Sequence, residues 1–440
     1  MIIFTLSILW FLAFTKKLSF WIWLWQLKEY HIGRFKDHFT TYKGKKLLLN
    51  PLMIIKIALA FTIYFYSEPI IAFIIIGLLF IESAFALLGF AKKRLRIPVL
   101  TRKTSVILSA GISLEFLIIS FLLATKISLV KTTAIFLLFD IAVPFITSFL
   151  VLAFQPLAVA MRNRVLSQAR KKIEGKEKLL VIGITGSYGK TSVKEFLSVI
   201  LSKKYKVFKT AEHKNSEIGI SNCIINGLED SHEIFISEMG AYNKGGIKLL
   251  ASIVHPKIGI ITGINEQHMS TFGSLENTIK TKFELIGSLP KDGIAILNYD
   301  NSNIKNQKVE NYNSNLQNVK FYSTNDKNCD LWAENIKAEL RSISFSIVSK
   351  DGDKADFELG LPGTHNISNV LAAAVCAKYL GMSLQEISDA CKEIDSKYSG
   401  IKVKEGINGL NIVDATYSSN PTGFISHMEY LKLWPGKKLS

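Results

Sequence analysis

The stretch Leu179-Leu-Val-Ile-Gly-Ile-Thr-Gly-Ser-Tyr-Gly-Lys-Thr-Ser192 decides the fold of the second half of the chain. An apolar run with strand character breaks into a glycine-containing turn that ends in Gly189-Lys190-Thr191. Glycines let backbone N–H groups approach a polyphosphate, and a helix starting near Lys190 directs its positive dipole end at the same anion. The pattern predicts a strand, a phosphate-binding loop and a helix, with Lys190 on the β- and γ-phosphates and Thr191 on Mg²⁺.

The spacing of this loop departs from that of an ordinary P-loop. Ile184 stands five residues before Gly189, and the upstream Gly183 lies one place too early. The alternative interpretation is a strand-turn-helix whose glycines serve only the turn. Because a phosphate-binding loop needs a strand before it and a helix after it, and the sequence predicts both, we favour phosphate binding.

Charge divides the chain in two. Residues 1–178 carry 24 Lys and Arg against 8 Asp and Glu, and the remainder carries 29 against 28, so the net charge of +17 belongs to the first part. That part also contains long runs of Ile, Leu and Phe. Basic residues beside apolar runs are typical of membrane topology signals rather than of a nucleic-acid-binding surface. A role in binding RNA or DNA is therefore disfavoured.

Five apolar segments of the first part are long enough to cross a bilayer core, which takes about 20 residues per helix. They are residues 3–25, 51–67, 69–91, 105–124 and 132–154. The loops at 28–46 and 92–103 are strongly basic, whereas the turns at 67–68 and 125–131 are weakly charged. By the positive-inside bias the basic loops are cytoplasmic. This topology places the N-terminus outside the cell (inner) membrane and the chain after Phe154 in the cytoplasm.

Charged residues within these segments leave two alternatives open. Lys16 and Lys17 interrupt the first segment, which is either a spanning helix or a shorter interfacial helix. Glu82, Glu115 and Asp140 lie within other segments. An intramembrane carboxylate is by default a functional hypothesis, such as a proton or substrate path, but carboxylates that face neighbouring helices also serve structure.

From Leu179 onward, short apolar runs alternate with segments of helical periodicity. The expected strands are 233–237, 258–262 and 293–297, and the clearest helices are 276–288 and 366–380. This alternation predicts an α/β fold with a mainly parallel sheet covered by helices. Ligands of such sheets bind beyond the carboxyl ends of the strands. Glu238, His268, Asn298 and Asp300 follow strands and are therefore candidate site residues. The segment 301–330 is polar and predicted to form exposed loops and irregular strands.

Further motifs accompany the phosphate-binding loop in a fixed order. They are Ser237-Glu-Met-Gly240, Thr262 to Ser274, Lys282-Phe-Glu284, Leu297-Asn-Tyr-Asp300, Leu361-Pro-Gly-Thr-His-Asn366 with Asn369, and Asp414 to Pro421. From about Leu179 to Leu433 the pattern resembles the Mur ligase family, ATP-dependent amino-acid ligases of peptidoglycan precursor synthesis. Within the family it is most similar to members that add D-alanyl-D-alanine. The resemblance also accounts for the shifted glycine of the loop.

The resemblance implies a reaction in which a carboxylate attacks the γ-phosphate of ATP and an amine captures the acyl phosphate to form an amide. Each step builds negative charge on phosphate, which cations must stabilise. Lys190, Lys282 and His268 are then the catalytic candidates. The implied Mg²⁺ ligands are Thr191, Glu238, His268 and Lys282, the last as a carbamoylated lysine.

The resemblance also implies the contacts of the nucleotide. These candidates are Thr185, Gly186, Ser187, Gly189, Lys190, Thr191 and Ser192 in the loop, Asn298 and Asp300 after a strand, His365 at the start of a helix, Asn366 and Asn369 around the adenine, and Asp414. Without the resemblance, Asn366 would be an ordinary helix N-cap. Two positions depart from the family pattern: Ala415 replaces a usual aspartate, and Lys402 offers a point charge where a bidentate arginine is usual.

These expectations divide the chain into four parts. Residues 1–158 form a membrane module, 159–178 a basic cytoplasmic linker, 179–405 the ATP-binding central domain and 406–440 the start of a Rossmann-like C-terminal domain. The membrane module stands where the family has a nucleotide-sugar domain, so the acceptor is a small-molecule or lipid-linked carboxylate, joined to an amino acid or dipeptide. The alternatives are a poly-γ-glutamate-synthase-like ligase and a nucleotide-binding membrane scaffold without turnover. The oligomeric state is not indicated.

Overall fold

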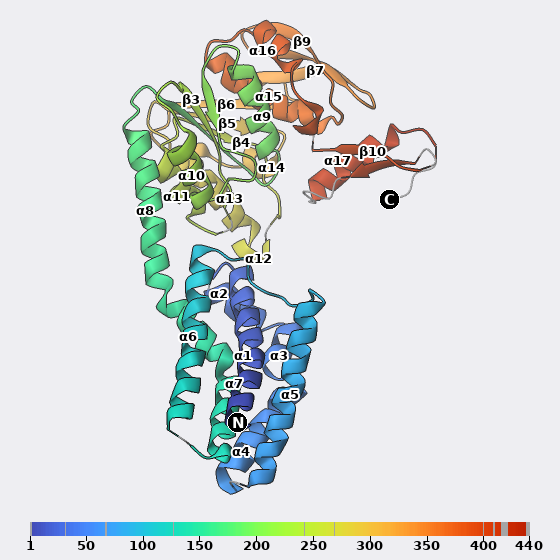
Figure 1. Ribbon diagram of the computed structural model, residues 1–440. Coiled ribbons are helices and arrows are strands. Elements are labelled where there is room, and N and C mark those ends of the chain that lie inside the picture. The colour runs from blue at the N-terminus through green and yellow to red at the C-terminus, as the bar shows by residue number, and fades with distance from the viewer. Residues whose placement is uncertain are drawn as a thin grey trace. The chain divides into compact units, whose positions relative to one another are not determined.

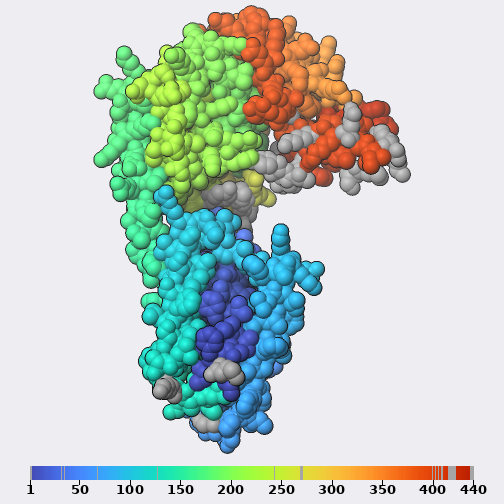
Figure 2. All heavy atoms as spheres, in the orientation of Figure 1, coloured from blue at the N-terminus to red at the C-terminus, as the bar shows by residue number. Residues whose placement is uncertain are grey.

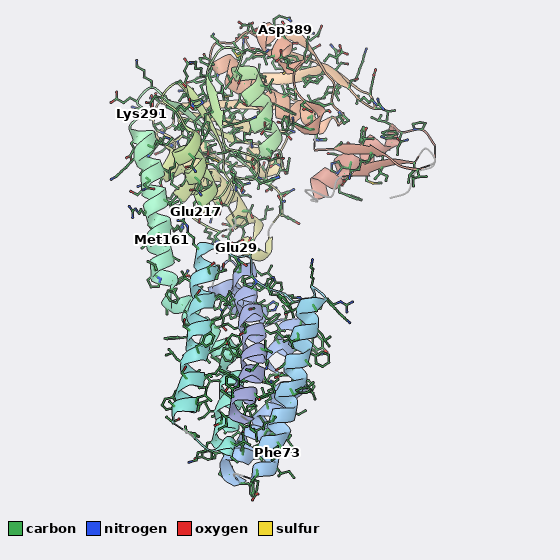
Figure 3. All side chains as sticks on the ribbon, in the orientation of Figure 1. Glu29, Phe73, Met161, Glu217, Lys291 and Asp389 are labelled. Atoms are coloured by element: carbon green, nitrogen blue, oxygen red, sulfur yellow. The ribbon has the colours of Figure 1, made fainter. Side chains whose placement is uncertain are left out.

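The chain folds as two units. The computed structural model describes residues 2–436 apart from 31, 67, 126, 242, 268, 399, 408–409 and 415–420. Contacts divide the chain into Met1–Met161 and Arg162–Ser440. Met161, labelled in Figure 3, lies on α8 (Gln155–Glu174), so one helix carries the chain from the first unit into the second.

The first unit consists of helices. They are α1 (Ile2–Leu27), α2 (Ile32–His38), α3 (Tyr42–Leu48), α4 (Pro51–Tyr66), α5 (Pro69–Ala91), α6 (Arg102–Ala124) and α7 (Leu129–Ala153). Among the described residues, five helical segments are long and apolar enough to cross a membrane, in agreement with the number predicted from the sequence. Helix α1, dark blue in Figure 2, packs against α5, α6 and α7. It continues without a break through Lys16 and Lys17, so the first segment is one long helix.

Four charged side chains meet inside this unit, and we name them the charge quartet: Lys17, Lys56, Glu82 and Asp140. The Lys17 Nζ lies 2.7 Å from Glu82 Oε2 and 2.5 Å from Asp140 Oδ1. The Lys56 Nζ lies 2.7 Å from Glu82 Oε1 and also pairs with Asp140. Each member comes from a different helix, α1, α4, α5 or α7. Two cations and two anions neutralise each other where an unpaired charge would be costly.

The third carboxylate of the apolar segments is placed differently. Glu115 on α6 is fully buried, and its Oε2 accepts a hydrogen bond of 2.8 Å from Thr15 Oγ1 on α1. All three carboxylates singled out in the sequence therefore face neighbouring helices. Their partners Lys56 and Thr15 were not identified from the sequence, because helical periodicity does not show which helices are neighbours.

Replacing Lys56 with Met should destabilise the helical unit, because Glu82 and Asp140 would then share a single cation. Breaking a buried ion pair costs about 3–5 kcal/mol, which should lower the thermal stability of the full chain in detergent. The double variant Lys56→Met/Glu82→Gln restores neutrality and should recover most of the loss. Lys45→Met, at an exposed lysine of α3, serves as the control. A single variant that melts with the wild type would contradict the role of the quartet.

The second unit contains a nine-stranded sheet. Its strands are β1 (Leu180–Thr185), β2 (Val207–Lys209), β3 (Ile234–Glu238), β4 (Ile258–Ile261), β5 (Ile294–Asn298), β6 (Asn318–Ser323), β7 (Leu331–Ala338), β8 (Ile343–Ser349) and β9 (Lys354–Leu359). The order is β2-β3-β1-β4-β5-β6-β7-β8-β9. Pairing is parallel from β2 to β7 and antiparallel from β7 to β9. The predicted α/β class with a mainly parallel sheet is confirmed.

Helices cover both faces of this sheet (Figure 1). One face packs against α9 (Lys190–Leu201), α15 (His365–Tyr379) and α16 (Leu384–Cys391). The other packs against the second half of α8, α10 (Glu217–Gly227), α11 (Gly246–Val254) and α13 (Leu275–Gly287). Along β1, Ile182 and Ile184 face the first set and Val181 the second, as strand alternation requires. Because helices cover both faces of the sheet, the ends of its strands are where polar side chains can meet a ligand.

Short elements complete the second unit. They are α12 (Met269–Phe272), α14 (Ser302–Lys305), η1 (Val309–Asn311), η2 (Ser396–Tyr398), β10 (Lys402–Glu405), β11 (Asn411–Asp414) and α17 (Pro421–Lys432). β10 and β11 pair as a separate antiparallel two-stranded sheet. The segment 301–330 was predicted to form exposed loops and irregular strands. It contains one strand, β6, which pairs in parallel and in regular register with β5, and the short helices α14 and η1.

Candidate functional site

The loop between β1 and α9 is packed so closely that its glycines have no room for a side chain. A Cβ on Gly186 would lie 2.2 Å from Thr262 Oγ1, and one on Gly189 would lie 2.7 Å from Asn369 Oδ1. Both glycines have positive φ, +154° and +78°, and Gly189 is the N-cap of α9. The loop is therefore fixed against the end of β4 and against α15, with the N-terminus of α9 directly behind it, as an anion-binding loop requires.

Lys190, the first residue of α9, folds back over this loop. Its Nζ donates hydrogen bonds to the carbonyl oxygens of Gly186 at 2.9 Å and Ser187 at 3.4 Å. Burial lowers the pKa of Lys190, and the nearby charge of Glu238 opposes that shift. The loop itself is anchored by Ser187, whose N–H donates to the carbonyl of Gly263 at 2.7 Å. The ammonium thus already lies at the position where phosphate oxygens would meet the loop.

A buried carboxylate stands beside the loop at the end of β3. Glu238 Oε2 accepts a hydrogen bond from Thr191 Oγ1 at 3.0 Å, and Oε1 accepts one from Asn215 Nδ2 at 3.0 Å. The Nζ of Lys194 lies 3.4 Å from Oε2. Burial works against ionisation, but the Asn215 hydrogen bond and the Lys194 charge keep the pKa of Glu238 below its usual value. Glu238 is therefore an anion at neutral pH.

Thr191 and Glu238 suit Mg²⁺, which prefers hydroxyl, carboxylate and phosphate oxygens and retains several waters. Within the part of the chain that the structure describes, no group of three or more His, Cys, Asp or Glu side chains could hold a metal. The protein-side donor set is thus sparse, as is usual where a nucleotide supplies the other ligands. His268, predicted as a further ligand, lies outside the described residues.

Lys282, on α13, is 3% exposed and lines a pocket together with Lys190. Burial lowers its pKa to about 7, the positive charge of Lys190 contributes to the lowering, and Glu284 opposes it. The pocket has a cavity volume of ≈ 40 Å³ and is lined by Gly186, Ser187, Lys190, Asn215, Gly240, Ala241, Gln267, Phe272 and Lys282. Two predicted catalytic lysines, distant in sequence, therefore line one cavity, and one of them carries a substantial neutral fraction near pH 7.

Two further predicted residues follow β5. Asn298 Nδ2 donates to the carbonyl of Thr262 at 2.8 Å, so Asn298 supports the end of β4 next to the loop. Asp300 accepts hydrogen bonds from the N–H and hydroxyl of Thr324 at 2.7 and 2.8 Å. It therefore ties the turn after β5 to the segment after β6. Thr185, the last residue of β1, donates to the carbonyl of Met239 at 3.0 Å.

The first turn of α15 also reaches the loop. Asn366 and Asn369 are buried, Asn366 Nδ2 donates to the carbonyl of Pro362 at 2.9 Å, and Asn369 Nδ2 donates to Asn366 Oδ1 at 3.1 Å. The N-cap of this helix is Thr364, so Asn366 is not the cap that its sequence position suggested. His365 begins the helix, and its ring centre lies 6.2 Å from that of His427.

Other predicted residues lie in different surroundings. Ser192 Oγ donates to the carbonyl of Tyr398 at 3.0 Å, which connects α9 with η2. Asp414 lies on β11 in the separate two-stranded sheet, where Lys404 Nζ is 2.6 Å from its Oδ2. The side chain of Lys402 and residues 415–420, including Ala415, are outside the described part of the chain.

Sequence reasoning missed three residues that shape the site: Lys194, Asn215 and Thr262. Lys194 could have been found, because it follows Lys190 by four residues and so lies on the same face of α9. In the sequence Thr262 is only the first residue of a motif, and nothing there indicates a role for its own side chain. Asn215 lies in an irregular segment before α10, where periodicity gives no signal.

Comparisons with known proteins agree with this arrangement. Residues 184–377 match the sequence profile of the Mur ligase middle domain. The chain is 31% identical to UDP-N-acetylmuramoyl-tripeptide–D-alanyl-D-alanine ligase of Escherichia coli over 66% of its own length and 60% of the relative's. It is 31% identical to the enzyme of the same name from Bacillus subtilis, covering 55% and 50% of the two chains. The chain thus spans about half to three fifths of the curated relatives it matches.

Solved structures show the same similarity. MurF from Acinetobacter baumannii superposes with a TM-score of 0.58 at 25% identity, covering 62% of this chain and 59% of that one. MurF ligase from Thermotoga maritima, solved in complex with ADP, gives a TM-score of 0.55 at 27% identity, covering 63% and 62%. The parallel sheet, the glycine-constrained loop and these matches together show that residues 184–377 resemble Mur ligase middle domains in sequence and in fold.

Proposed function

We propose that the chain is a membrane-anchored, ATP-dependent ligase that joins an amino acid or dipeptide to a carboxylate through an acyl phosphate. The observation that carries the proposal is the loop at the N-terminus of α9, with Lys190 over it and the Thr191–Glu238 pair beside it. The similarity to UDP-N-acetylmuramoyl-tripeptide–D-alanyl-D-alanine ligases favours D-alanyl-D-alanine addition in peptidoglycan precursor synthesis. The acceptor is a small-molecule or lipid-linked carboxylate.

Each part of the loop then has a role. The backbone at the start of α9 holds the phosphates of ATP, and Lys190 exchanges its two carbonyl partners for phosphate oxygens. Thr191 and Glu238 would hold Mg²⁺, which would supply positive charge for the transferred phosphoryl group. Asn298, Asn366 and Asn369 shape the walls on the β5 and α15 sides. His268 is proposed as a second metal ligand from the sequence alone.

Lys282 is proposed to carry a carbamate. A neutral amine attacks CO₂, the new N–C bond forms, and the displaced proton leaves to solvent. Burial of Lys282 lowers its pKa to about 7, so its reactive neutral form is populated near neutral pH. The product would replace a cation next to Lys190 with an anionic oxygen donor suited to Mg²⁺.

We further propose that the five long apolar segments cross the cell (inner) membrane with the N-terminus outside. The basic loops between them and the positive-inside bias support this orientation. Residues 1–158 would then be the membrane module, 159–178 its basic linker, 179–405 the cytoplasmic ATP-binding domain and 406–440 a C-terminal segment. This orientation exposes the phosphate-binding loop to cytoplasmic ATP.

Replacing Lys190 with Ala should strongly reduce nucleotide-dependent turnover, because the phosphates would lose the cation that lies over the loop. The full chain in detergent would be given ATP, Mg²⁺, D-alanyl-D-alanine and candidate acceptors, with ADP release and product mass as the readouts. The wild type should release ADP only with both substrates, and the variant should lose about a hundredfold or more. Lys203→Ala, at an exposed lysine after α9, is the matched control. ATP retention by the wild type without amine-dependent ADP release would indicate a scaffold instead.

Replacing Gly186 with Ala should weaken ATP binding strongly, because the new Cβ would lie 2.2 Å from Thr262 Oγ1. The loop would have to move away from β4, and its N–H groups would lose their common direction. Gly352→Ala is the control for backbone strain, since Gly352 also has positive φ, +90°, but open space around its Cβ position. Equilibrium binding of labelled ATP measures both variants. Equal affinities for the two variants would contradict the proposed loop.

Carbamate formation on Lys282 should depend on pH in a defined direction. Below its pKa of about 7 the side chain is an unreactive ammonium, and above it a neutral amine, so the carbamate signal should rise with pH through that value. The measurement is ¹³C NMR of the full chain with labelled bicarbonate. Lys282→Ala should remove the signal and the activity, and small carboxylates should restore activity. Lys280→Ala, at an exposed lysine of the same helix, is the control. Unimpaired activity of Lys282→Ala would exclude the role.

A further inference from the structure

A second lysine of α9 is more deeply buried than its chemistry favours. Lys194 is 0% exposed, although lysine is almost never buried without a partner. Its Nζ lies 3.2 Å from Glu195 Oε1 and 3.4 Å from Glu238 Oε2. Neither contact meets hydrogen-bond geometry, so among the described residues the ammonium is held by charge alone. Because no hydrogen bond fixes the direction of the Lys194 ammonium, this group suits the role of a counter-charge better than that of a directional hydrogen-bond donor.

Lys194 is one link in a row of alternating charges. Glu238 contacts Lys194, Lys194 contacts Glu195, and Glu195 pairs with Lys209 on β2. The Lys209 side chain is 35% exposed, so the row runs from the phosphate-binding loop to the surface. Glu195 has a cation on each side, whereas Glu238 has only Lys194 within ion-pair distance among the described residues. Loss of Lys194 would leave Glu238, and not Glu195, without a contacting cation.

Two cations can therefore neutralise the carboxylate of Glu238. One is Lys194, which belongs to the protein, and the other is the proposed Mg²⁺, which would bind together with the nucleotide. A buried carboxylate without a contacting cation is destabilising, which favours the entry of water and local opening of the structure. Lys190 cannot replace Lys194 in contact, because its Nζ is bonded to the carbonyls of Gly186 and Ser187. The hydrogen bonds from Thr191 and Asn215 orient Glu238 but carry no full charge.

We propose that Lys194 is the resident counter-cation of Glu238, a positioning residue that holds the carboxylate in place between β3 and α9 until Mg²⁺ arrives with the nucleotide. This inference rests on the proposed Mg²⁺ site. Once the metal is bound, it supplies the positive charge, and the ammonium becomes redundant for holding β3 and α9 together. Lys194 thus allows the protein to remain ordered at the phosphate-binding loop between catalytic cycles.

The test is hydrogen exchange of peptides from β3 and α9 in the full chain, with ADP plus EDTA and with ADP plus Mg²⁺. In EDTA, Lys194→Met should exchange about tenfold faster than the wild type or more, because Glu238 is buried and uncompensated. With Mg²⁺ the ratio of variant to wild-type rates should fall towards one. A lysine that merely packs the helix would give the same ratio in both conditions, which would overturn the proposal.

Two further variants keep the test decisive if Lys194→Met folds poorly. The neutral pair Lys194→Met/Glu238→Gln should exchange like the wild type in EDTA, and exchange as fast as the single variant would overturn the proposal. Lys209→Met removes the cation at the surface end of the row. Its ratio of variant to wild-type exchange rates should be the same with EDTA and with Mg²⁺. Equilibrium dialysis of ADP with the wild type separates the two claims. Binding that does not tighten with Mg²⁺ contradicts the proposed metal site, whereas Mg²⁺-dependent binding with an unchanged exchange ratio contradicts only the role of Lys194.

Discussion

Compensation of buried charge is the constraint on which both units of this protein depend. In the second unit, Glu238 is an anion at the end of a strand whose two faces are covered by helices, and Thr191, Asn215 and Lys194 surround it. These partners come from the start of α9, the segment after β2 and the body of α9. Burying one carboxylate therefore fixes the position of the phosphate-binding loop relative to the sheet.

The helical unit satisfies the same constraint with a closed set of charges. Lys17, Lys56, Glu82 and Asp140 come from four helices and neutralise one another. In apolar surroundings such a set specifies which helices are neighbours, because any other arrangement leaves a charge unpaired. The two units differ in the net charge that remains after these pairs have formed. The quartet has equal numbers of both signs, whereas the pocket of the second unit also holds Lys190 and Lys282, which suit an anionic ligand.

The sequence predicted most of the scaffold and part of the site. The α/β class, the strand ends carrying Glu238 and Asn298, and the helix starting at Lys190 follow from periodicity and from glycine placement. The antiparallel strands β7 to β9 did not, since alternating polar segments do not indicate direction of pairing. Lys56 was not predicted as an ion-pair partner, because a lysine near the start of an apolar helix is usually a topology signal. The neighbours of Glu238 depend on tertiary packing and became visible only in the structure.

The most direct measurement is the structure of the full chain with Mg²⁺ and a non-hydrolysable ATP analogue, determined by crystallography or electron cryomicroscopy. The account predicts a γ-phosphate within hydrogen-bond distance of Lys190 and the loop between β1 and α9. It also predicts a metal between that phosphate, Thr191 and Glu238. A nucleotide bound elsewhere, or a metal that touches neither of these two residues, would contradict it.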